Sequence, residues 1–361
     1  MSDIIQVVEL SKTFGDIRAV DGVSFTVGAR EIFGFLGPNG AGKSTTIKML
    51  ATLLKPTGGR ATLAGYDVAT QPTEVRQSIG LVFQDQSLDN RLTADENLKF
   101  HAMLYDVPGD VYRERADQVL KMVDLLDRRS SIVMTYSGGM KRRLDLASAL
   151  MHQPPLLILD EPTEGLDPQS RTALWEELER IGAQGTTMLL TTHYMEEADR
   201  LCSRLAIVDN GRIVVEGAPQ ELKETVGADS VVLQLESTDG TGIARGVAGS
   251  DASGDGEGDG IDRDGAGKSG EGDGIDRVGA VCRRLEGLVP CEAVAAHPAG
   301  VVLSVPNAGA AVPQLMRRID GDGLRITGLQ MTRPSLDDVF LKYTGRHIRE
   351  EAADQPIIMG W

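Results

Sequence analysis

Cysteine and long apolar runs are scarce in this chain of 361 residues. It has three cysteines, Cys202, Cys282 and Cys291, an odd number without metal-ligand pairing, which argues against a disulfide framework and favours a reducing cytoplasm. No apolar run approaches the roughly 18 residues that can cross a bilayer. The first residues, MSDIIQVVEL, also lack the basic and apolar regions of a secretory signal. We therefore expect an intracellular protein that would reach a membrane only through a partner.

Basic residues are also fewer than acidic ones, because the chain has 37 Lys and Arg and 53 Asp and Glu, which gives a net charge of −16. Neutralising the phosphates of nucleic acid needs clustered Lys and Arg, so we expect no nucleic-acid partner. Much of the acidity lies in residues 238–279, where 14 of 42 residues are glycine and ten acidic residues face four basic ones. So few apolar groups cannot offset the entropy of ordering, and we predict a flexible insertion there.

Upstream of residue 226, short apolar stretches alternate with amphipathic ones, which is typical of an α/β fold with a mostly parallel sheet. The apolar stretches predict buried strands, and the amphipathic stretches predict helices. The expected strands are 32–36, 156–159, 187–191 and 205–208, and the expected helices are 43–53, 112–125, 138–151, 168–183 and 195–201.

Downstream, the pattern changes to the order β-α-β-β-α-β, which predicts a small α+β ferredoxin-like layer of helices on one sheet. Its expected elements are strands 230–235, 292–296, 300–305 and 324–331 and helices 278–285 and 308–319. A last short helix is expected over 336–343. The predicted domains are therefore 1–225, then 226–345 with the insertion at 238–279, and a tail at 346–361.

The strongest motif is a glycine-rich loop between an expected strand and an expected helix. It matches G-x-x-x-x-G-K-[ST], and its backbone N–H groups can wrap a phosphate at the helix start. In this motif Lys43 is expected to reach the β and γ phosphates of a nucleotide, and Ser44 to offer its hydroxyl to Mg²⁺. A chance glycine-rich turn is the alternative. The expected nucleotide-binding residues of the loop are Gly37, Pro38, Asn39, Gly40, Ala41, Gly42, Lys43, Ser44 and Thr45.

Two carboxylates follow the apolar strand LLIL, and they make that alternative less attractive. Asp160 at the carboxyl end of the strand can hold a metal ion, partly through water. Glu161, one residue further on, can polarise a water that attacks the γ phosphate. Together these features indicate hydrolysis of a nucleotide with Mg²⁺; ATP as that nucleotide is implied by the family resemblance given next. A solvated strand end would carry adjacent acids as well, but not with the loop of Lys43 upstream.

The stretch YSGGM, followed by KRRLDLASAL, resembles the signature sequence of the ABC ATPases. Other motifs of that family appear in the family's order: Gln84 in LVFQD matches the Q-loop, Asp167 in EGLDP the D-loop, and His193 in LLTTHY the switch histidine. Phe14 in SKTFG stands where an aromatic residue stacks on adenine. The resemblance implies a P-loop ABC ATPase domain with a helical signature subdomain. The signature residues are Tyr136, Ser137, Gly138, Gly139 and Met140.

The resemblance also implies roles for these residues. Glu161, His193, Lys43 and Gln84 would be catalytic, and Mg²⁺ would be held by Ser44, Asp160 and Gln84. The chain is most similar to the daunorubicin/doxorubicin-resistance type of drug exporter, through YSGGM with its basic pair, LDDVFL at 336–341 and TGR at 344–346. The acidic insertion is not part of that pattern.

The family resemblance implies partners as well. Two copies of the chain would face head to tail when ATP is bound, each ATP lying between one copy's loop and the other copy's signature. A separate membrane permease would dock on residues 84–105, so the chain would be peripheral on the cytoplasmic face of the cell membrane. We expect an ATPase subunit that powers efflux of a drug or natural product. The alternatives are a non-transport ABC ATPase, of the translation or DNA-repair type, or the ATPase of an importer.

One basic run stays open at this stage. Lys141, Arg142 and Arg143 follow the signature at the start of an expected helix. A solvated helix face explains such a run as well as a specific contact does. His101, His152, His297 and His347 stand in no motif, and we expect structural roles for them.

Overall fold

The structure, a computed structural model, describes residues 3–227, 229–237, 293–297, 300–305, 308–319 and 324–345. The chain divides into two compact units, one of Met1–Lys223 with Leu336–Trp361 and the other of Glu224–Ser335. The acidic insertion, the expected helix 278–285 and the expected tail lie outside the described residues. None of the described helices is long and apolar enough to cross a membrane.

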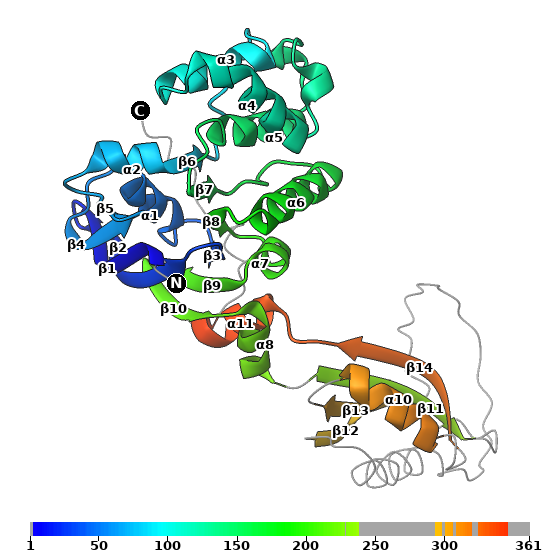
Figure 1. Ribbon diagram of the computed structural model, residues 1–361. Coiled ribbons are helices and arrows are strands. Elements are labelled where there is room, and N and C mark those ends of the chain that lie inside the picture. Colours follow the sequence, from blue (N-terminus) through cyan, green and yellow to red (C-terminus); the bar gives the residue numbers. More distant parts are fainter. Residues whose placement is uncertain are drawn as a thin grey trace, which may run out of the picture. The chain divides into compact units, whose positions relative to one another are not determined.

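A six-stranded sheet forms the centre of the first unit (Figure 1). Its strands pair in parallel, except that the edge strand β10 runs antiparallel to β9, and every residue of β7 and β8 is buried. This confirms the mostly parallel sheet. In spatial order the strands are β10 (Arg212–Gly217), β9 (Arg204–Asp209), β3 (Ile32–Leu36), β8 (Thr187–Thr192), β7 (Leu156–Asp160) and β6 (Ile79–Val82).

A second, antiparallel sheet of the first unit was not expected. It consists, in spatial order, of β2 (Ile17–Gly28), β1 (Asp3–Phe14), β4 (Gly58–Leu63) and β5 (Tyr66–Asp67). Phe25 on β2 stacks on Phe33 of β3, with ring centroids 5.6 Å apart, and meets Phe35 edge-on at 4.8 Å. The two sheets therefore share one apolar core. Strand β3 lies in this core, and the glycine-rich loop begins where β3 ends.

The helices of the first unit form two groups. One group consists of α1 (Lys43–Leu50), α2 (Pro72–Ser78), α6 (Pro168–Ala183) and α7 (Met195–Leu201). The other consists of α3 (Ala94–Leu104), α4 (Gly109–Met122) and α5 (Gly138–Ala149), which pack on one another next to the edge strand β6 (Figure 1). The sequence analysis did not predict α3, although Thr93 and Glu96 form a capping box at its start. Helix α8 (Pro219–Val226) follows β10.

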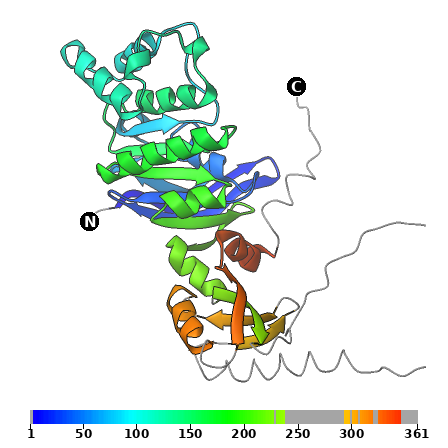
Figure 2. The ribbon, with the colours of Figure 1, turned by 90° about the vertical axis from the view of Figure 1, so that its right-hand side faces the viewer.

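The second unit is a four-stranded antiparallel sheet with α10 (Ala308–Ile319) packed against β11 and β14 (Figure 2). Val231, Leu233, Leu303 and Leu315 are buried in this unit. The strand order and the one described helix fit the expected ferredoxin-like layer. In spatial order the strands are β12 (Ala293–His297), β13 (Gly300–Val305), β11 (Asp229–Ser237) and β14 (Leu324–Thr332).

The last helix, α11 (Leu336–Thr344), differs from the expected domain division. The sequence analysis placed it in the C-terminal domain, whereas in the structure it groups with the first unit and contacts α7 and β10. Leu336, Val339 and Phe340 share one face of the helix and are buried. A face at i, i+3 and i+4 needs an apolar partner, and elements of the first unit supply it.

Candidate nucleotide-binding site

The loop between β3 and α1 requires glycine at several positions. Gly40 and Gly42 have φ angles of 82° and 98°, in the left-handed region that favours glycine. A Cβ added to Gly37 would lie 2.2 Å from the carbonyl oxygen of Val208, so only glycine fits there. Helix α1 begins directly after Gly42, and the free N–H groups at a helix start attract anions.

The side chain of Lys43 lies back over this loop and is only 3% exposed. Its ammonium group donates to the carbonyl oxygens of Gly37 at 2.7 Å and Pro38 at 3.0 Å. The same Nζ is 3.1 Å from Oε1 of Glu161. The positive charge of Lys43 is thus held over the loop, where it would contact a phosphate bound to the N–H groups of the loop.

Oxygen ligands suited to Mg²⁺ lie beside Lys43. Ser44 Oγ donates to Asp160 Oδ1 at 3.0 Å, and Thr191 Oγ1 donates to the same oxygen at 2.6 Å. Asp160 is 3% exposed at the carboxyl end of β7. A hydroxyl and a carboxylate at a parallel-strand end fit the hard, oxygen-seeking Mg²⁺ ion.

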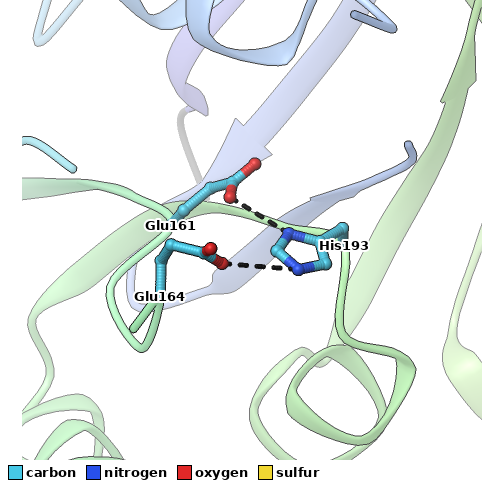
Figure 3. Close-up of side chains that lie close together, drawn as sticks. All are labelled: Glu161, Glu164 and His193. Atoms are coloured by element: carbon cyan, nitrogen blue, oxygen red, sulfur yellow. Dashed lines mark hydrogen bonds and ion pairs between the residues drawn. The ribbon is translucent and has the colours of Figure 1, made fainter. Parts of the chain in front are cut away.

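Glu161 and His193 are in direct contact, as Figure 3 shows. Oε2 of Glu161 is 3.0 Å from Nδ1 of His193, and Nε2 of His193 is 3.4 Å from Oε2 of Glu164. Burial on its own raises the pKa of Glu161, but the hydrogen bond from His193 and the charge of Lys43 outweigh it and hold the pKa below its ordinary value. Glu161 therefore stays ionised, as a group that accepts a proton must.

The backbone of Glu161 is also unusual. Its φ angle is 47°, a left-handed conformation that is costly for a residue other than glycine. Its N–H donates to the carbonyl oxygen of Thr191 at 3.1 Å and to the Thr191 hydroxyl at 3.0 Å. These bonds from β8 help to hold the strained residue in place.

Glu164 was not among the expected site residues. Together with Glu161 and His193 it presents ligand atoms within 4.8 Å of one another, so the three side chains could hold a cation. The hydrogen bond and ion pairs among them already account for this closeness. The signal for Glu164 in the sequence was its position between Glu161 and Asp167, in a loop that adjoins the expected site.

A cavity of about 360 Å³ is lined by eight of the expected residues and by Ala19. Phe14 lies at the end of β1, is 47% exposed and has the Lys12 ammonium 5.0 Å from its ring centroid; it is not among the described lining residues. Asp160 and His193 adjoin the cavity through Ser44 and Glu161. The described lining residues are Ala19, Asn39, Gly40, Gly42, Lys43, Ser44, Thr45, Gln84 and Glu161.

The signature residues lie elsewhere, and none of the described residues that line this cavity belongs to them. Ser137 caps α5, its Oγ accepting from the N–H of Met140 at 3.2 Å, and the buried Tyr136 donates its hydroxyl to the carbonyl of Arg128. Gly138 is the first residue of α5. Gly139 packs so closely on Ser170 that an added Cβ would be 2.5 Å from Ser170 Oγ.

The D-loop meets the signature at this point. Asp167 caps α6 and accepts from the N–H of Ser170 at 3.0 Å and from its hydroxyl at 2.7 Å. The structure therefore brings the signature and the D-loop together, apart from the cavity of the glycine-rich loop. One chain carries two separate helix starts suited to anions, at Lys43 and at Gly138.

Within the basic run after the signature, Arg142 is not part of a solvated face. Arg142 is 4% exposed, and burial lowers the pKa of its guanidinium. It donates to four main-chain carbonyl groups, whereas Arg143 donates to the carbonyl of Val123 at 3.1 Å and lies 4.0 Å from the carboxylate of Asp124. A signal existed in the sequence, because Arg142 precedes Leu146 and Ala149 at helical spacing and so falls on the buried face of α5.

Comparison with known protein families agrees with this geometry. Residues 20–164 match the family described as ABC transporter, and residues 283–344 match the C-terminal domain of ATP-binding proteins of the DrrA1-3 type. The chain is 38% identical over 347 residues to "Daunorubicin resistance ATP-binding protein DrrA2" of Streptomyces coeruleorubidus, which covers 96% of each chain. It is 46% identical over 231 residues to the daunorubicin/doxorubicin resistance ATP-binding protein of Streptomyces peucetius, covering 64% of this chain and 70% of that one.

Solved structures support the same assignment. An ATP-binding subunit of an ABC transporter matches with a TM-score of 0.56 and 33% identity, over 62% of this chain and 92% of that one. A dimeric ATP-binding cassette, MJ0796, bound to ADP and Pi, matches with a TM-score of 0.54 and 27% identity, over 59% and 98%. The fold and the family match are those of an ABC-type ATPase.

Within that class, the chain belongs to the daunorubicin-resistance family of ABC transporter ATP-binding proteins. This confirms the expected family and the ATPase class. The names of the relatives support the export function and not the alternatives of translation, DNA repair or import.

Proposed function

We propose that this chain binds and hydrolyses ATP with Mg²⁺ and thereby powers export of a drug or natural product through a separate membrane permease. The observation that carries the proposal is the arrangement of Lys43, Glu161 and His193 beside the cavity of the glycine-rich loop. The names of the relatives add the transported class, since they concern resistance to daunorubicin and linearmycin and export of Nod factor.

In the proposed reaction the loop amides and Lys43 bind the phosphates, and Phe14 stacks on the adenine. Ser44, Asp160 and Gln84 hold Mg²⁺, which, when bound, neutralises charge on the phosphate oxygens. Glu161 accepts the proton of the attacking water. His193 fixes the carboxylate of Glu161 through Nδ1, and its Nε2, which lies 3.4 Å from Oε2 of Glu164, would exchange that partner for the γ phosphate when nucleotide is bound.

We propose that the signature acts on the ATP of a second copy of this chain. Ser137 and its neighbours form a helix start but do not line the described cavity of their own chain. A head-to-tail pair would place each signature opposite the partner's glycine-rich loop, with Asp167 at the contact. Such a pair is closed and symmetric.

The proposed permease contact lies on residues 84–105. Helix α3 in this stretch exposes Phe100, Met103 and Leu104 at 57%, 71% and 60%, an apolar surface suited to a partner. Gln84, at the start of the same stretch, reaches the cavity and would link that surface to the nucleotide. The chain would be peripheral, on the cytoplasmic face of the membrane.

Replacing Lys43 by Ala tests the ATPase part of the proposal. Without the ammonium group, ATP binding to the full-length chain is expected to weaken at least about a hundredfold, which corresponds to a loss of about 2.8 kcal/mol. Lys48→Ala is a matched control, because Lys48 lies on the same helix but is exposed. Calorimetric titration with Mg·ATP and phosphate release measure the two effects, and equal binding by wild type and Lys43→Ala would refute the site.

Co-purification from membranes with an integral membrane protein, followed by ATPase assays with candidate compounds, tests the transport part. Export predicts that the partner stays bound and that a transported compound changes the ATPase rate. A chain that hydrolyses ATP but recovers no membrane protein would contradict the transport part alone.

A further inference from the structure

The helix that begins with the signature reaches into the catalytic loops through Arg142. Its Nε donates to the carbonyl of Pro162 at 2.6 Å, and its Nη2 donates to those of Glu161 at 3.0 Å and Asp160 at 3.2 Å. Its Nη1 donates to the carbonyl of Phe83. One side chain of α5 thus binds the strand end that carries Glu161 and the residue directly before Gln84.

A second side chain of α5 holds the other end of the Gln84 segment. Asp145, one turn after Arg142, accepts from the hydroxyl of Ser87 at 2.7 Å and from its N–H at 3.4 Å. Gln84 lies between Phe83 and Ser87. The segment that brings Gln84 to the cavity is therefore fastened at both ends to a single turn of the signature helix.

Only a guanidinium can make this set of contacts. Arginine offers five N–H donors in a planar fork, whereas the lysine ammonium has three donors on one atom and cannot span carbonyls on two segments. Both Arg142 and Asp145 are 4% exposed, and their opposite charges lie one turn apart. Asp145, Glu197 and Asp160 lie near Arg142, and their attraction offsets part of the cost of burying its charge.

The backbone conformation of Glu161 explains why the hydrogen bonds from Arg142 are needed. A left-handed φ in a residue other than glycine persists only when its surroundings hold it. Thr191 binds the N–H of Glu161, and Arg142 binds its carbonyl oxygen and those of both neighbours. The residue is thus restrained on each side.

We propose that Arg142 is a positioning residue for ATP hydrolysis, which holds the backbone of Glu161 in its left-handed conformation and fixes the Gln84 segment to the signature helix. It acts through Glu161 and Gln84 and lines no part of the cavity itself. This inference rests on the proposed ATPase function of the site.

The test compares Arg142→Lys with Arg143→Lys in the full-length chain. Arg142→Lys keeps the charge but loses the fork, and kcat is expected to fall about tenfold or more. KM and the Kd for Mg·ATP are expected to change less than about threefold, because Lys43 and the loop amides are untouched. Arg143→Lys, on the same helix, should leave kcat within about twofold of wild type.

Amide hydrogen exchange of the nucleotide-free chain provides a measurement independent of turnover. In Arg142→Lys, exchange is expected to accelerate at residues 83–87 and 161–164, while the slow amides of β8 keep their rates. A purely structural loss would instead lower the protection of the whole unit and reduce kcat only in proportion to the folded fraction.

A second variant keeps the inference testable if Arg142→Lys does not fold. Ser87→Ala removes the exposed hydroxyl that binds Asp145, and it should lower kcat several-fold with unchanged Mg·ATP binding. Wild-type kcat in Arg142→Lys or, failing its folding, in Ser87→Ala would overturn the positioning role while leaving the proposed function intact. A wild-type chain without ATPase activity, alone or with its membrane partner, would instead refute the proposed function.

Discussion

Exchanging Glu161 for Gln removes one charge from a buried pair and leaves the shape of the site unchanged. Lys43 Nζ, 3% exposed, would lose the carboxylate that lies 3.1 Å away and keep the carbonyls of Gly37 and Pro38. Removing one member of a buried ion pair costs about 3 to 5 kcal/mol. Because these two carbonyls remain, we expect the lower value, about 3 kcal/mol, in the free energy of unfolding without nucleotide.

The same change should strengthen ATP binding. In the wild type a phosphate that takes the Lys43 ammonium replaces part of its attraction to Glu161. If the wild type loses about half of this 3 kcal/mol attraction between Lys43 and Glu161 when ATP binds, then Glu161→Gln, which has no such attraction to lose, binds ATP about tenfold more tightly. Loss of the proton acceptor should at the same time lower turnover by about a hundredfold to ten-thousandfold. The variant should therefore accumulate as an ATP-bound dimer.

Four measurements on the full-length chain check these values: urea unfolding, calorimetric titration with Mg·ATP, phosphate release, and gel filtration with ATP. Glu164→Gln is the matched control, because Glu164 also contacts His193 but is more exposed and has no ion pair with Lys43. The reasoning is refuted if Glu161→Gln keeps more than about a tenth of the wild-type turnover. It is also refuted if the variant binds ATP more weakly than the wild type.

Two further outcomes follow from burial and from charge. Phe340 on α11 is 1% exposed, so Phe340→Ala should lower the free energy of unfolding by about 3 to 5 kcal/mol in urea titrations. Tyr343 on the same helix is 40% exposed, so Tyr343→Ala should lower it by less than about 1 kcal/mol. Equal losses in the two variants would contradict the packing of α11. The lowered pKa of Glu161 means that its ionised form is favoured in the folded state. This carboxylate therefore stabilises the fold when the pH is above its ordinary pKa of 4.5. The stabilisation is lost as the pH falls through the lower pKa of the folded state. The stability difference between wild type and Glu161→Gln should therefore shrink as urea titrations move from pH 7 to pH 3, and a constant difference would contradict the ion pair.

Contiguous motifs made the strand, loop and helix around Lys43 predictable, because the glycines and Lys43 that mark the loop lie within a dozen residues, although distant groups such as the Val208 carbonyl also crowd it. The same holds for helix starts such as Asp167, whose partner Ser170 is three residues away. The parallel strands were predictable because strands such as β7 are apolar along their whole length.

Contacts between residues far apart in the sequence limited what could be predicted from it. Arg142 binds Phe83, which is 59 residues away in sequence, and nothing near KRR indicates such a partner. The antiparallel pairing of β1 with β2 and β4 also escaped the sequence pattern, because it joins Val7 to both Phe25 and Ala61. Helix α11 adjoins the second unit in sequence but packs on α7 and β10.

The return of α11 to the first unit means that the chain enters and leaves the second unit from the same body. The accessory unit is thus an insertion near the carboxyl end and not an appendage. Shortening the chain at residue 226 would remove α11 too and expose the apolar surface that Phe340 covers.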